Sequence, residues 1–130
     1  MAERPRREIL VIEDEEKIAS LVKSELESIG YSVRTEGSGR AALTSAAEHQ
    51  PDLVILDLKL PDMDGYEVCR ELRNLSRAWV TPVLILTAMS QPIDQLRGVA
   101  HGADAYLIKP FELDTLVQTV AQLLGETTIA

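Results

Sequence analysis

The chain has one cysteine, two histidines and no long apolar run, and these shortages exclude several classes of protein. Because Cys69 is the only cysteine, no disulfide can form within the chain, which fits a cytoplasmic protein. His49 and His101 have no second histidine or cysteine at metal-site spacing, so we expect both at helix ends on the surface. The longest apolar runs are only as long as a strand, so the sequence predicts no transmembrane helix.

Basic charge is also scarce. The 130 residues include 13 Lys and Arg against 21 Asp and Glu, which gives a formal net charge of −8. Direct nucleic-acid binding needs a basic face, so we expect none from this domain. The first seven residues are basic but contain no apolar stretch, so they are not a secretory signal. We expect one domain over residues 8–125, a disordered tail over 1–7 and a C-terminal tail over 126–130.

Strand and helix patterns alternate five times along the chain, which is typical of βαβ units around a parallel sheet. The expected strands cover about 8–12, 31–35, 53–56, 83–86 and 105–108. The expected helices cover about 15–29, 38–49, a stretch after the loop 61–65, 90–102 and 113–124. The fold class is therefore α/β, a doubly wound sheet covered by helices on both faces.

Polar residues follow four of these apolar strands. The strand ends carry Glu13-Asp14, Asp57, Thr87 and Lys109. Ligands of open parallel sheets bind at the carboxyl ends of the strands. We therefore expect one acidic pocket that contains a single lysine and a single threonine.

The acids of this pocket allow two interpretations. Asp14 suits the start of a helix, where a carboxylate caps free backbone N–H groups. Capping does not account for Asp57, which arrives from a different strand. Three converging carboxylates repel one another, and a divalent cation relieves that repulsion. Oxygen ligands favour Mg2+ or Ca2+, so we predict a metal site.

Asp57 itself is either a metal ligand, a structural acid or a nucleophile. A carboxylate can attack a phosphoryl group and form an aspartyl phosphate. The negative charge on that group requires cations and hydrogen-bond donors placed in advance, which Lys109 and Thr87 supply. Tyr106, near Lys109, either packs in the core or moves together with Thr87.

Several motifs, taken together, resemble the receiver domain of two-component response regulators. They cover nearly the whole chain in order, with matching gaps. The matching segments are residues 9–15, 52–57, 61–65, 84–88 and 102–111. The resemblance implies a flavodoxin-like sheet of order 2-1-3-4-5 with five flanking helices.

The resemblance also implies roles for the pocket residues. Asp57 would be phosphorylated by a histidine kinase or phosphotransfer protein. The Mg2+ cofactor would be surrounded by Glu13, Asp14, Asp57 and the backbone carbonyl of Lys59. Many members carry Asp at the position of Glu13, and the longer side chain still reaches the metal.

Further implied roles concern the switch itself. Thr87 and Lys109 would bind phosphoryl oxygens. Thr87 turning inward, followed by Tyr106, would reshape the face formed by the fourth helix, the fifth strand and the fifth helix. A downstream protein or output domain would bind this face.

Three other functions compete with a phosphorylation switch. A haloacid dehalogenase-type phosphatase needs a second Asp two residues after the nucleophile, and Lys59 stands there. A flavin carrier needs a first loop that cradles phosphate, and the acids that begin at Glu13 repel it. A receiver kept only as a docking surface is expected to lose Asp57, Thr87 or Lys109, and all three are present.

Two further expectations concern lifetime and assembly. Lys59 and Met89, each two residues past a pocket residue, are expected to flank the path of the hydrolytic water and to slow self-dephosphorylation. Receivers of the winged-helix class pair through ion pairs that involve Asp, Glu and Arg at the positions of Ala105, Thr115 and Thr119. This chain keeps Arg97 but lacks those three, so we expect a monomer or a weak dimer.

Overall fold

The computed structural model describes residues 6–76 and 79–126 and contains a five-stranded parallel sheet of order β2-β1-β3-β4-β5. The strands are β1 (Glu8–Ile12), β2 (Ser32–Glu36), β3 (Leu53–Leu56), β4 (Val83–Thr87) and β5 (Ala105–Ile108). This topology confirms the fold class and the strand order expected from the sequence.

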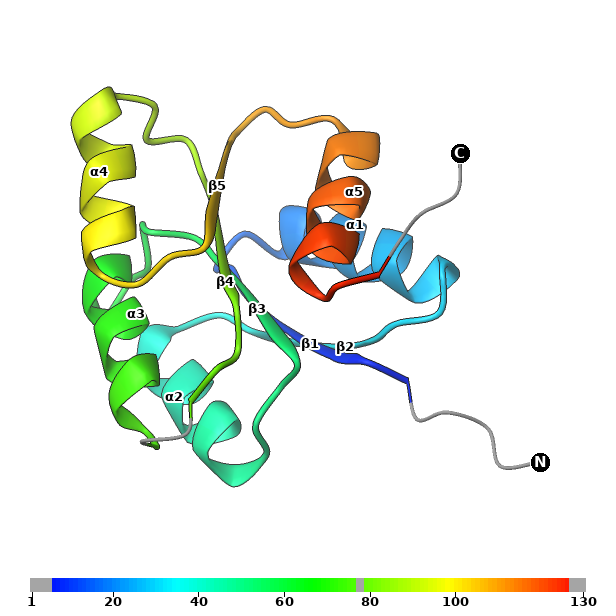
Figure 1. Cartoon of the computed structure of the whole chain (residues 1–130), viewed down its shortest axis with the longest axis horizontal. Helices are drawn as coiled ribbons and strands as arrows, with labels where there is room; N and C mark the ends of the chain where they lie inside the picture. Colours follow the sequence, from blue (N-terminus) through cyan, green and yellow to red (C-terminus); the bar gives the residue numbers. More distant parts are fainter. Residues whose placement is uncertain (1–5, 77–78, 127–130) are drawn as a thin grey trace.

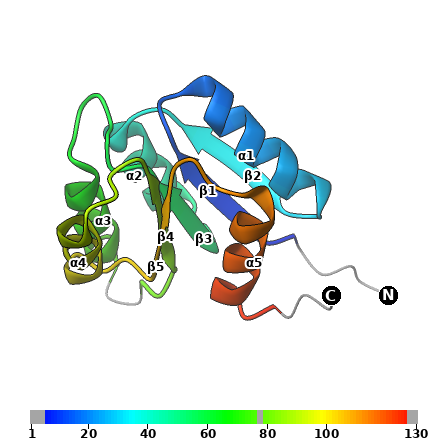
Figure 2. The same cartoon turned by 90° about the horizontal axis from the view of Figure 1, so that it is seen from above.

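Helices cover both faces of the sheet, as Figures 1 and 2 show. They are α1 (Glu16–Ser28), α2 (Gly39–Glu48), α3 (Gly65–Asn74), α4 (Pro92–Ala100) and α5 (Leu113–Leu123). The first and last helices lie on one face, and the other three lie on the opposite face. The observed ends differ from the expected ones by one or two residues.

The central strands are apolar throughout because both of their faces are buried. In β1, Ile9 and Val11 belong to the core formed with α1 and α5, whereas Leu10 and Ile12 belong to the core formed with α2 and α3. Strands buried on both faces read as continuous apolar runs rather than as alternating patterns. The same double burial holds for Leu53–Leu56 in β3.

Local sequence signals account for several helix ends. Ser38 caps α2 by accepting a hydrogen bond from the backbone N–H of Ala41, and Asp64 caps α3 by accepting one from Tyr66. His49 and His101 directly follow α2 and α4, which is where the sequence predicted them. His49 is exposed, whereas His101 is partly buried with its ring beside that of Tyr66.

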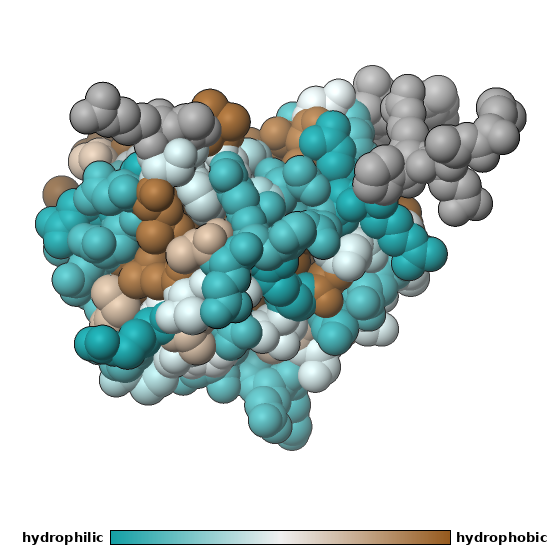
Figure 3. Space-filling view, turned by 90° about the horizontal axis from the view of Figure 1, so that it is seen from below, coloured by the Kyte–Doolittle hydropathy of each residue, from teal (hydrophilic) through white to brown (hydrophobic). Residues whose placement is uncertain are grey.

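Helix α4 differs from the other helices in what it buries. Its buried residues are Asp94 and Gly98, while its large apolar side chains face solvent. Ile93, Leu96 and Val99 are 55%, 66% and 69% exposed, respectively. The face seen in Figure 3 is mostly hydrophilic, with hydrophobic residues in separate patches.

Part of each expected tail lies outside the described residues, namely 1–5 and 127–130. Within the described part, the carbonyl of Arg7 accepts a hydrogen bond from Ser32, and the Glu126 carboxylate accepts one from the hydroxyl of Tyr31. The domain boundaries therefore stay a prediction. No helix over residues 6–76 and 79–126 is long and apolar enough to cross a membrane.

Candidate functional site

Pairing between β1 and β3 brings three acids together at the carboxyl edge of the sheet. Ile12 lies opposite Leu56, and the backbone N–H of Asp57 donates to the carbonyl of Ile12 over 2.9 Å. Glu13 and Asp14 directly follow β1, so they leave the sheet beside Asp57. Parallel register therefore places residues 44 positions apart in one pocket.

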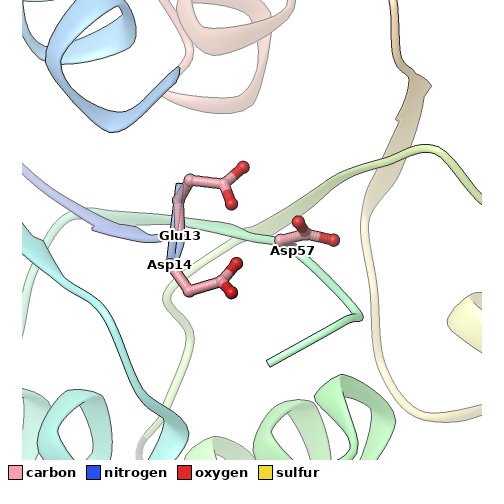
Figure 4. A group of neighbouring side chains, drawn as sticks. All are labelled: Glu13, Asp14 and Asp57. Atoms are coloured by element: carbon pink, nitrogen blue, oxygen red, sulfur yellow. The ribbon is translucent and has the colours of Figure 1, made fainter. Parts of the chain in front are cut away.

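One carboxylate oxygen from each of Glu13, Asp14 and Asp57 lies within 4.8 Å of the other two. Figure 4 shows these carboxylates close together at the ends of their strands. Glu13 and Asp57 are each only 5% exposed, whereas Asp14 is open to solvent. Such a set of hard oxygen donors suits Mg2+, which keeps several waters on its open side. The three carboxylates among the expected metal ligands are thus brought together.

Lys109 contacts two of these acids, Glu13 and Asp57. Its backbone N–H donates to the carbonyl of Thr87, which fixes the turn after β5 against the end of β4. Its ammonium lies 2.9 Å from Oδ2 of Asp57 and also donates to Oε1 of Glu13. The Lys109–Pro110 peptide bond is cis. Because its ammonium is mostly buried and contacts both acids, Lys109 is a pocket residue rather than a solvated surface lysine.

Burial and charge act together on the ionisation of this pocket. Burial raises the pKa of Glu13 to about 7, and the nearby Asp57 carboxylate adds to that rise. Lys109 and the backbone N–H of Glu15 oppose it. For Lys109, burial lowers the pKa, but hydrogen bonds to Glu13 and Asp57 outweigh burial, so the net shift is upward. The lysine therefore holds its proton firmly between two acids.

Thr87 ends β4 with a buried hydroxyl. The residue is 0% exposed, and its Oγ1 atom has no hydrogen-bond partner among residues 6–76 and 79–126. Buried polar groups are normally hydrogen-bonded, so this hydroxyl still has the capacity to form a hydrogen bond. Thr87 lies at the same sheet edge as Asp57 and Lys109.

Comparison with known proteins identifies the family. A sequence model of the response regulator receiver domain matches residues 9–121. The chain belongs to the receiver domain family of response regulators.

Named relatives agree with this membership. Response regulator ArlR of Staphylococcus aureus is 39% identical over 117 residues, which cover 90% of this chain and 52% of ArlR. The chain thus spans about half the length of the curated relatives it matches. Receiver domains are phosphorylation-dependent signalling switches of two-component systems rather than enzymes in the ordinary sense.

Solved structures show the same receiver fold. The chemotaxis protein CheY4 of Vibrio cholerae superposes with a TM-score of 0.87 at 34% identity, covering 92% of this chain and 99% of that one. A response regulator described as putative from Chloroflexus aurantiacus gives a TM-score of 0.88, also at 34% identity, covering 94% of this chain and 100% of that one.

The contacts of three other predicted site residues of this receiver are also defined. Lys59 is exposed, and its backbone N–H donates to Oδ1 of Asp57 over 3.1 Å. Tyr106 is partly buried, and its hydroxyl donates to the carbonyl of Met89 over 2.6 Å. Met89 and Tyr106 both pack against a small core cluster that includes Tyr66.

Sequence reasoning missed the roles of two residues at the start of α3. A Cβ atom at Gly65 would lie 2.4 Å from Cα of Leu58 and 2.9 Å from the carbonyl oxygen of Asp57, so only glycine fits there. The sequence marked this position merely as a loop residue. The hydroxyl of Tyr66 donates to the carbonyl of Asp94 over 2.7 Å. An apolar helix position gave no signal for that polar contact.

Proposed function

We propose that this receiver accepts a phosphoryl group on Asp57 from a histidine kinase or phosphotransfer protein. An oxygen of the Asp57 carboxylate attacks phosphorus, and the bond from phosphorus to the donor's histidine nitrogen breaks. The electron pair of that bond stays on the imidazole. The pocket contributes position and charge, which are the main sources of rate in phosphoryl transfer.

Mg2+ is the cofactor that the pocket suits. Its ligands would be the carboxylates of Glu13, Asp14 and Asp57, together with the backbone carbonyl of Lys59. Support comes from the hard oxygen donors gathered within 4.8 Å. When bound, the ion neutralises negative charge on the acids and on the incoming phosphoryl group.

Thr87 and Lys109 would bind the phosphoryl oxygens of phosphorylated Asp57. The buried Thr87 hydroxyl lacks a partner among the described residues, and a phosphoryl oxygen would accept its hydrogen bond. Lys109 already contacts Asp57 and would pair with the added charge. Tyr106 would then follow Thr87 and change the face formed by α4, β5 and α5, where a downstream protein or output domain binds.

The surroundings of Asp57 give the strongest support for the proposal. Asp57 is buried beside two further carboxylates, and the Lys109 ammonium contacts both Asp57 and Glu13. A carboxylate needed only for folding gains nothing from two acidic neighbours, because like charges disfavour its ionised form. The same arrangement serves a nucleophile that works with a cation and a lysine.

The experiment is phosphorylation by acetyl phosphate with Mg2+, read from the intact mass. We expect one added phosphoryl group in the wild type, none in Asp57→Asn, and little labelling when Mg2+ is chelated. Asp64→Asn is the matched control, because asparagine still caps α3 and the residue lies outside the acidic cluster. A stable adduct on Asp57→Asn would refute the assignment.

The lifetime of the phosphorylated state is the next prediction. We propose that Lys59 and Met89 flank the approach of water, with Met89 excluding it and Lys59 stabilising the phosphoryl oxygens. Lys59→Asn combined with Met89→Glu is expected to speed self-dephosphorylation about tenfold, or about 1.4 kcal/mol in the barrier. Phosphate release is measured after removal of the donor. An unchanged or slower rate would show that these side chains do not control the water.

We also propose that this receiver is a monomer or a weak dimer. Arg97, the retained member of the ion-pair set, lies with its guanidinium carbon 4.8 Å from the centre of the Tyr66 ring. Ala105, Thr115 and Thr119 carry no charge, so they cannot form an ion pair with Arg97. Sedimentation of the phosphorylated protein tests this, and a tight dimer through α4, β5 and α5 would overturn it.

A further inference from the structure

Tyr66 of α3 makes three contacts with α4 and the residue that follows it. The hydroxyl of Tyr66 donates to the backbone carbonyl of Asp94 over 2.7 Å. Arg97 stacks on the Tyr66 ring, and the ring of His101 lies 5.2 Å from it, measured between centroids. Residues three and four positions apart share a helix face, so these three contacts lie along one side of α4.

Tyr106 meets the same side of α4 from β5. A Cβ atom at Gly98 would lie 3.0 Å from Cδ1 of Ile85 and 3.3 Å from Cδ2 of Tyr106, so the helix backbone approaches both side chains closely. The Tyr106 hydroxyl also holds the carbonyl of Met89, in the segment that leads into α4.

The two tyrosines also influence each other. Both pack in or against the cluster of Leu58, Tyr66 and Ile85. Burial raises the pKa of Tyr106, and its neighbours Tyr66 and Asp94 raise it further. Burial likewise raises the pKa of Tyr66. The hydroxyl groups therefore share one weakly solvated region beneath α4.

We propose that Tyr66 is a positioning residue that anchors α4 to α3 and couples the position of this helix to Tyr106. The apolar side chains of α4 point to solvent, and Asp94 and Gly98 are its buried residues, so little apolar packing replaces the tyrosine contacts. Loss of the Tyr66 hydroxyl frees the start of α4 without removing a pocket residue.

The first test needs no phosphorylation. Amide hydrogen exchange is measured at α4 and at β3 in the wild type, Tyr66→Phe and Tyr31→Phe. Tyr31 is the matched control, because it is also a buried tyrosine with a hydrogen-bonded hydroxyl. Its hydroxyl donates to the Glu126 carboxylate, and its ring lies in the core formed with α1 and α5. We expect α4 to exchange about fivefold faster in Tyr66→Phe, with β3 and the control unchanged. Equal exchange of α4 in Tyr66→Phe and wild type overturns the proposal.

The second test measures coupling to Tyr106. Exchange of α4 is compared in Tyr66→Phe, Tyr106→Phe and the double variant. If both hydroxyls hold the same segment, the double variant exchanges clearly more slowly than the product of the two single effects predicts. A double effect equal to that product shows that the tyrosines act independently, and it refutes the coupling.

The third test rests on the proposed function and uses beryllofluoride with Mg2+ as a phosphoryl analogue. Slowed exchange around Asp57 reports binding. We expect the analogue to change α4 exchange in the wild type and to change it far less in Tyr66→Phe, although both proteins bind. An equal change in both overturns the coupling. If the wild type does not bind, the proposed function fails, and the first two tests still decide the role of Tyr66.

Discussion

Helices α3 and α4 lie on the same face of the sheet but are held there in different ways. Helix α3 buries half of its ten residues, and α4 buries two of its nine. The buried residues of α3 are Gly65, Tyr66, Val68, Cys69 and Leu72, whereas those of α4 are Asp94 and Gly98. One helix is fixed by apolar packing, the other by hydrogen bonds and stacking.

Because the two helices are packed differently, we expect them to have different roles. Segments with few buried apolar contacts open at low free energy, and the elements that move in switching come from this group. The exposed stripe of Ile93, Leu96 and Val99 also gives α4 an apolar surface that a partner can cover. Helix α3 instead keeps the Asp57 loop in place through Gly65. The following substitutions test this difference between α3 and α4.

The largest expected difference comes from leucines at buried and exposed positions. Leu72 of α3 is 0% exposed, so Leu72→Ala should lower the free energy of unfolding by about 3 kcal/mol. Leu96 of α4 is 66% exposed, so Leu96→Ala should change it by less than about 0.5 kcal/mol. Urea unfolding at neutral pH measures both. Similar losses in the two variants would mean that α4 is packed as firmly as α3.

A smaller difference is expected between two glycines. Gly65→Ala forces a methyl group against the backbone of Leu58, so it should cost about 2 kcal/mol. Gly98→Ala meets only the tip of Ile85 and the Tyr106 ring, and alanine favours a helix by about 1 kcal/mol. We therefore expect a net change below about 1 kcal/mol, measured by thermal unfolding. A larger loss at Gly98 would reverse the comparison.

The smallest effect on stability concerns the thiol of α3. Burial raises the pKa of Cys69 from 9.0 to about 11. At pH 8 its thiolate fraction is therefore about a hundredfold below that of a free thiol, and alkylation should be correspondingly slow. A cysteine placed on α4 by Val99→Cys, in a Cys69→Ala background, should react at the rate of a free thiol. Alkylation followed by mass compares them.

The raised pKa of Cys69 also makes the stability of the fold depend on pH. Between pH 9 and about 11 the unfolded chain releases the Cys69 proton while the folded chain keeps it. The free energy of unfolding therefore falls as the pH rises through that range. Rapid alkylation of Cys69 at pH 8 would show instead that α3 opens as readily as α4.

Much of the fold was predictable from short stretches of sequence. Apolar runs of about four residues located β1, β3 and β4, because strands buried on both faces leave no alternation. The edge strand β2 is not such a run, and it was expected instead from Tyr31 and Val33 on one face. The side chains of the pocket were predictable for a related reason. Parallel strands end at one edge, so Glu13, Asp57 and Lys109 had to meet there once the order of the strands was known.

Helix α4 shows where this reasoning stops. Its apolar residues recur at helical spacing, and that pattern ordinarily indicates a face turned toward the core. In the structure the opposite face is inside, because Tyr66 offers a hydroxyl to Asp94 and Gly98 allows close approach to Tyr106. Periodicity shows that a helix has an apolar and a polar face, but it does not show which face packs against the neighbouring elements.

The sequence by itself determined the class of fold, the edge of the sheet that carries the pocket and the residue types within it. The fold class, the edge and the residue types follow from the pattern of apolar and polar residues within short segments, because that pattern marks where each strand begins and ends. Only the tertiary structure decided that Thr87 is buried without a described partner, that Gly65 closes on the Asp57 loop and that α4 rests on Tyr66. Those features depend on three-dimensional distances between segments far apart in the chain, which no local pattern encodes.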